Sequence, residues 1–176
     1  MKAFHLVLFA GLLLATGTSY ARSMRAWTYD DLLKESDLVV IASVVDTKVV
    51  PTTDDLSANG LGRSGYHIQQ LETVFLVKVV LKGKHQQKRL DLVHFRYDPK
   101  VNEPILNGPT LIEFPNSDQI AKSIEGNKRG YGKDYLLFLK LRKDGKCGPV
   151  TGQVDPLFSI RELGNPSELT LPQPSK

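Results

Sequence analysis

The chain has 176 residues, of which 41% are hydrophobic, a composition that suits one globular domain with a sizeable core. Its net charge of +4 is too small to indicate attraction to phosphate backbones, so a nucleic-acid partner is not expected. The single cysteine, Cys147, excludes an internal disulfide, and the fold must therefore be stabilised by burial alone.

The N-terminus has the pattern of a secretory signal. Lys2 precedes an apolar run over residues 6–15, and small and polar residues follow up to Ala21. We expect residues 1–21 to be a cleaved signal peptide and Arg22 to begin the mature chain. Export without disulfides or an Asn-x-Ser/Thr site indicates a bacterial periplasmic or extracellular protein. No later segment is long and apolar enough to span a membrane, so no integral membrane segment is expected after cleavage.

The first structural elements of the mature chain are a short helix and a buried strand. Thr28 is a typical N-cap, and the pattern predicts a helix over residues 29–36, with Trp27 packed beside its first turn. The run over residues 38–45 is apolar at both parities, which is typical of a strand buried on both faces. Residues 52–65 are rich in Gly and Ser and predict a mobile, exposed loop.

A hairpin is predicted next. Residues 66–81 alternate as a long strand whose odd-numbered side chains, from Leu71 to Leu81, face inward. A basic turn follows, and the chain returns as a strand over residues 90–97. In the Pro-containing segment 98–132, we expect a short strand at residues 110–114 and a helix near residues 117–125.

The C-terminal part reads as three further strands. Residues 134–142 form a clear strand that runs into Asp144-Gly145, a hairpin signal, with residues 148–154 as the partner strand. A final strand is expected at residues 158–163, and residues 165–176 form an extended tail containing prolines. The prediction is a mostly β domain over residues 22–164, a five- to six-stranded OB-like barrel with a short N-terminal helix and a possible second one.

Three hydrophobic blocks, at residues 36–44, 73–83 and 132–139, are followed by the Asp144-Gly145 turn. This succession resembles the netrin-like and tissue-inhibitor-of-metalloproteinases (TIMP-like) superfamily, which has cysteine-poor exported relatives in bacteria. The resemblance covers about residues 36–163 and implies an OB-fold barrel with a protein-binding role. The animal inhibitors place a disulfide-bonded cysteine at the mature N-terminus, whereas residues 22–28 contain none, so no inhibitory residue is carried over.

The residues offer no catalytic or metal-binding constellation. No histidine lies at ligand spacing with another His or Cys, so no metal or cofactor is expected. His94 shares the parity of Leu90 and Leu92, which favours a core or barrel-mouth position. Cys147 lies between glycines and a lysine, and we expect an exposed hairpin cysteine with a lowered pKa. We therefore expect a protein that is not an enzyme.

Two regions are candidates for recognition. Basic clusters occur at residues 82–89 and 128–133, and the first is followed by a strand that carries aromatic and basic side chains. The candidate binding surface comprises Lys82, Lys84, His85, Lys88, Arg89, His94, Arg96 and Tyr97. Together with the 52–65 loop, it predicts an exported binding module for a protein or an envelope polymer. The alternatives are an inhibitor or small enzyme with His94, Arg96 and Tyr97 at a barrel mouth, and a purely structural envelope protein.

Overall fold

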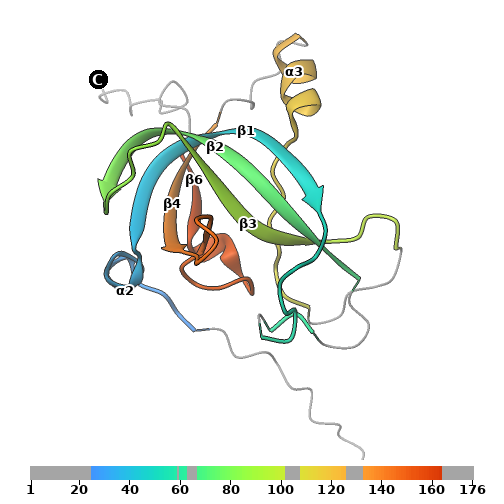
Figure 1. Cartoon of the computed structure of the whole chain (residues 1–176), viewed down its shortest axis with the longest axis horizontal. Coiled ribbons are helices and arrows are strands. Elements are labelled where there is room, and N and C mark those ends of the chain that lie inside the picture. The colour runs from blue at the N-terminus through green and yellow to red at the C-terminus, as the bar shows by residue number, and fades with distance from the viewer. Residues whose placement is uncertain (1–24, 59, 63–66, 102–107, 126–132, 164–176) are drawn as a thin grey trace, which may run out of the picture.

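The computed structural model describes residues 25–58, 60–62, 67–101, 108–125 and 133–163 (Figure 1). The predicted signal peptide and the proline-containing tail lie outside these residues. In chain order the described elements are α2 (Tyr29–Glu35), β1 (Leu38–Val50), β2 (Ile68–Lys82), β3 (Arg89–Tyr97), α3 (Ser117–Glu125), β4 (Asp134–Leu141), β5 (Cys147–Pro149), the 3₁₀ turn η1 (Pro156–Phe158) and β6 (Ile160–Leu163).

The strands close into a small barrel, which confirms the mostly β, OB-like prediction. The sheet order is β1-β2-β3-β5-β4-β6, and β1 also pairs with β4, so β1 to β5 form a closed ring and β6 extends β4. All neighbouring pairs are antiparallel except β3 and β5, which are parallel. Closure leaves few free strand edges, as expected for strands this apolar.

Helix α2 follows the predicted local signals. Thr28 accepts a hydrogen bond from the backbone N–H of Asp31, and the Asp31 carboxylate accepts one from the backbone N–H of Thr28, which completes a capping box. The helix has only two turns and needs tertiary packing to be stable. Leu32 supplies that packing in an apolar cluster with Val39, and Trp27 packs against the same cluster.

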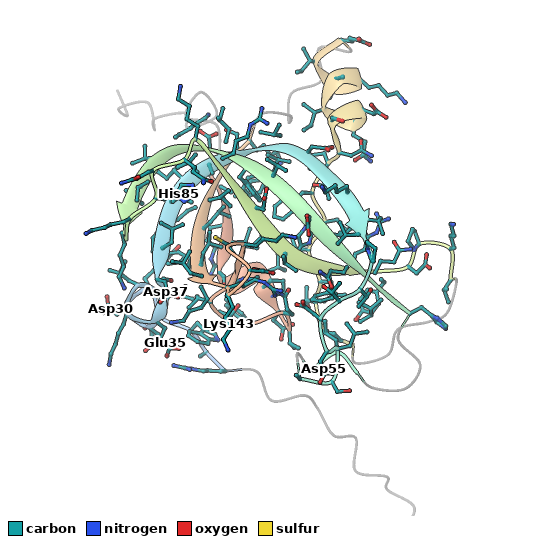
Figure 2. All side chains as sticks on the ribbon, in the orientation of Figure 1. Asp30, Glu35, Asp37, Asp55, His85 and Lys143 are labelled. Carbon is teal, nitrogen blue, oxygen red and sulfur yellow. The ribbon has the colours of Figure 1, made fainter. Side chains whose placement is uncertain are left out.

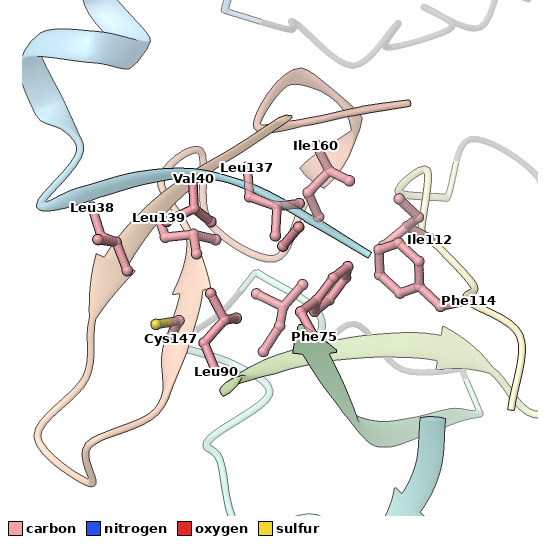
Figure 3. Packing of buried hydrophobic residues seen from close by; sticks show 12 residues of the cluster. Leu38, Val40, Phe75, Leu90, Ile112, Phe114, Leu137, Leu139, Cys147 and Ile160 are labelled. Carbon is pink, nitrogen blue, oxygen red and sulfur yellow. The ribbon is translucent and has the colours of Figure 1, made fainter. Parts of the chain in front are cut away.

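The main core fills the inside of the barrel (Figure 3). Phe75 lies at its centre and meets Phe114 and Tyr135 edge to face, with ring centroids 5.1 and 6.1 Å apart. Strand β1 contributes to both the main core and the cluster under α2, because Val40 packs inside the barrel while Val39 packs outside against α2. The predicted burial on both faces is therefore confirmed for residues 38–40, whereas Ile41 and residues 43–45 are only partly buried.

Three β-bulges shift the register between β1 and β2, and they change which residues face the core. Val79 pairs with Ile41 and Val77 with Ala42, so Lys78 is an extra residue on β2. Leu81 is an extra residue in the same way, between the pairs of Val80 and Lys82. The odd-numbered side chains of β2 face inward as predicted up to residue 77. For Val79 and Leu81 the prediction is wrong, because the bulges interrupt the alternation and leave them 45% and 56% exposed.

The other differences lie in the second half of the chain. Residues 110–114 do not form the predicted strand, although Ile112 and Phe114 are buried in the core. The predicted helix at residues 117–125 is confirmed as α3, which stands off the barrel with its first turn near β1 (Figure 1). β5 spans only residues 147–149, and η1 occupies the start of the predicted final strand.

Candidate functional site

The predicted recognition residues fall at two ends of the barrel. The 51–67 connection joins β1 to the start of β2, whereas the basic turn follows the end of β2, which runs for fifteen residues. His85 in the basic turn and Asp55 in the connection lie on opposite sides of the molecule (Figure 2). The predicted loop and the predicted turn therefore do not form one continuous surface.

His94 lies in the barrel interior with no exposed surface. Its Nδ1 lies 3.1 Å from the carbonyl oxygen of Ile112, which can only accept, so Nδ1 carries the proton and donates. Nε2 therefore accepts from the hydroxyl of Thr73, at 2.7 Å, and Thr73 in turn lies 2.9 Å from the hydroxyl of Thr47. Burial lowers the pKa of His94 to about 4, so the ring is neutral near neutral pH.

Arg96 and Tyr97 are also used within the fold. The Arg96 Nε donates to the Gln69 side chain at 3.0 Å, and the Tyr97 hydroxyl donates to the carbonyl oxygen of Pro109 at 2.7 Å. Strand alternation directs Tyr97 to the face opposite His94 and Arg96. These three side chains therefore do not converge on one open site, and His94 adds nothing to a binding surface.

The described part of the 52–65 loop is fastened to the barrel, which corrects the prediction that all of it is exposed. Arg142 and Asp54 form a bidentate ion pair at 2.7 and 2.8 Å. The side-chain oxygen of Gln70 accepts from the backbone N–H groups of Thr53 and Asp54. Leu61 anchors the far side of the loop, because it is only 1% exposed.

This fastened loop lies over the outer side of β2 and β3. Gln70 and its partner Phe95 belong to that side, and both are buried. Gln153, from the segment after β5, donates to the carbonyl oxygen of Val93 and covers the same region. In OB folds this sheet face and the loops around it often bind ligands. Here the chain's own loop and the segment after β5 cover it.

Cys147 is buried in the main core and is not an exposed hairpin thiol, which corrects the prediction. β5 places it beside Leu92 and Leu141, where it is 2% exposed. Burial raises the pKa of the Cys147 thiol to about 11, in the opposite direction to the prediction. A thiol in this position is unreactive near neutral pH.

In the basic turn, one lysine is hydrogen-bonded to helix α2, and three other cations form no ion pair within the described residues. The Lys82 ammonium donates to the carbonyl oxygens of residues 33, 34 and 36 and so caps the C-terminus of α2. Lys84, Lys88 and Arg89 are exposed and form no ion pair with any residue in the described ranges. His85 Nε2 lies 3.1 Å from the carbonyl oxygen of Arg89 and holds the turn together.

Exposed apolar side chains beside these cations are the feature that sequence reasoning missed. We call residues 76–89, the end of β2 with the turn and the first residue of β3, the hairpin arm. On it Leu76, Val79, Val80 and Leu81 are 37–56% exposed. The signal was present as a run of apolar residues, but regular alternation assigned half of them to the core.

The second basic cluster, at residues 128–133, lies outside the described residues except for Lys133, which forms an ion pair with Glu162. Within the described ranges, no three His, Cys, Asp or Glu side chains gather as a metal-binding group. The helices described there are too short or too polar to cross a membrane. A scan against protein-family models and a search of curated proteins both find no match.

Proposed function

We propose that this chain is a non-enzymatic exported binding module that recognises a protein through the hairpin arm. One observation carries the proposal: the arm combines exposed apolar side chains with Lys84, Lys88 and Arg89, whose charges are not used within the described fold. Surfaces that expose grouped apolar residues usually mark interaction sites. Export to a bacterial periplasm or the medium is part of the same proposal and is supported by the signal pattern of residues 1–21.

The groups that would serve an enzyme are accounted for in other ways. His94 is buried and held in one tautomer by its two hydrogen bonds, and Cys147 is a buried core residue with a raised pKa. These positions support a structural use of both residues. Recognition by a rigid barrel with a projecting arm also agrees with the protein-binding role that the netrin-like and TIMP-like resemblance implies.

Site-specific crosslinking tests the proposal. A photo-crosslinking amino acid replaces Leu81 on the arm of the full chain, and the matched control carries it at Ile124 of α3, which is 70% exposed. We expect a discrete crosslinked protein from position 81 in envelope extracts and none from position 124. The same crosslinks from both positions, or none from either, would refute the proposal, and a crosslink to a glycan polymer would assign the alternative partner.

A further inference from the structure

The outer side of the hairpin arm has an apolar row next to positive charge. Leu76 and Val79 pair with Ser43 and Ile41 of β1, and both are more than 40% exposed. Arg89 is the cross-strand partner of Leu76 on β3 and lies on the same face. Leu81, the extra residue of the second bulge, continues the exposed row toward the tip.

The charge of the arm has one sign. No Asp or Glu occurs between residues 73 and 90, whereas this stretch holds five Lys and Arg residues. Lys78 is neutralised by Asp134 of β4, and Lys82 caps α2. The remaining three cations, at positions 84, 88 and 89, face solvent. The next acidic residue along β3, Asp91, lies opposite Val74 and interacts electrostatically with Lys146 and Cys147 near β5.

The backbone of the arm is only partly paired. β3 pairs with β2 only as far as Arg89 opposite Leu76, and one more hydrogen bond joins the Val77 N–H to the Lys88 carbonyl oxygen. Beyond this point the returning segment 83–88 is not a strand, and no backbone hydrogen bond joins it to residues 78–82. Residues 78–82 therefore make no backbone hydrogen bond on the side away from β1 within the described residues, and such groups are those that strand addition uses.

We propose that the hairpin arm binds an extended acidic segment of a partner protein. Its apolar side chains would pack on Leu76, Val79 and Leu81, and its carboxylates would meet Lys84, Lys88 and Arg89. A second copy of this chain is a poor occupant, because pairing two arms brings cations of the same sign together. A polyanionic glycan would satisfy the charges but would leave the apolar row exposed. The inference rests on the proposed function and adds the chemistry of the partner.

The test uses a fluorescent peptide of about twelve residues that alternates Glu with Val, which matches a strand with one charged and one apolar face. Matched peptides replace Glu by Ser or by Lys. We expect the acidic peptide to bind the full chain at least about tenfold more tightly than the others, and amide exchange to slow at residues 76–89. The K84E/K88E variant should lose this binding, whereas K100E/K122E, which reverses two exposed lysines elsewhere, should keep it.

The apolar half of the proposal has its own variant, V79S/L81S, which should weaken peptide binding while leaving the charge unchanged. Equal binding of the three peptides, or binding that survives K84E/K88E, would overturn the inference. A polyuronate that binds the arm as tightly as the acidic peptide, with an affinity that V79S/L81S does not change, would also overturn it. Self-association of the chain through the arm would do the same. If the crosslink from position 81 to a partner protein persists in the K84E/K88E variant, the inference that the partner segment is acidic is overturned, but the proposed function stands.

Discussion

Acidification from neutral pH should destabilise the protein through His94. The pKa of His94 is about 4 in the fold because the ring is buried, against an ordinary value of 6.5. The unfolded chain therefore takes up the proton first, and the stability present above the ordinary value is lost as the pH falls from 6.5 toward 4. The difference corresponds to about 3 kcal/mol in total, of which about 2 kcal/mol is lost by about pH 5.

Urea denaturation followed by the fluorescence of Trp27, the single tryptophan, measures this effect. The free energy of unfolding of the wild-type chain should fall by about 2 kcal/mol between neutral pH and about pH 5. In His94→Gln the level at neutral pH is lower, because the ring packing is lost, but the slope across this window should nearly vanish. His85→Gln, which removes a half-exposed histidine of the basic turn, should keep the wild-type slope.

Two carboxylates with lowered pKa values, Asp37 and Asp144, affect stability only below this pH window. The backbone N–H of Leu141 holds the pKa of Asp37 below its usual 3.8, and the Arg142 side chain does the same for Asp144. Their stabilising effect is present above that usual value and is lost only at more acidic pH. A wild-type stability that stays flat down to about pH 5, or an undiminished slope in His94→Gln, would refute the reasoning about burial.

Three further outcomes are expected. Arg142→Gln breaks the bidentate pair with Asp54, so amide exchange in residues 53–61 should accelerate and the free energy of unfolding should fall by about 1–2 kcal/mol. Unchanged exchange would show that the pair does not hold the loop. Phe75→Ala should cost about 3–5 kcal/mol by urea denaturation, whereas Leu76→Ala should cost under about 0.5 kcal/mol, and similar losses would contradict the assigned faces. Cys147 should resist thiol reagents in the folded chain and react only when urea unfolds it, and rapid native labelling would contradict its burial.

Much of the fold follows from signals within a few residues of one another. The N-cap at Thr28, the Asp144-Gly145 turn and the β2–β3 hairpin each depend on local chemistry, and the sequence predicts each of them. The closing pair of the barrel is different, because β1 meets β4 across about a hundred residues of chain. It was predicted only through the argument that apolar strands avoid free edges.

The errors share a physical cause, which is that burial depends on contacts distant in sequence. Cys147 has polar and glycine neighbours in the chain, yet the parallel pairing of β5 with β3 places it against Leu92. Asp54 has the sequence context of a solvated loop, but Arg142, which follows β4 and is 88 residues away in the chain, binds it. No local pattern contains either partner. The bulge at Lys78 is similar, because an extra residue is visible only against the register of β1.

The same contacts explain why the candidate site lies at one end of the barrel. Around the β1–β2 loop, the charged groups Asp54, Arg142, Glu72 and Lys146 pair with one another, and Leu61 closes the loop over buried side chains. At the hairpin arm the opposite holds, because the bulges turn Val79 and Leu81 outward, and Lys84, Lys88 and Arg89 form no ion pair with the described residues. Satisfied polar groups contribute little new free energy to a partner, whereas exposed apolar area and unpaired charge both do. A ligand that binds this barrel without disturbing it therefore gains most at the arm.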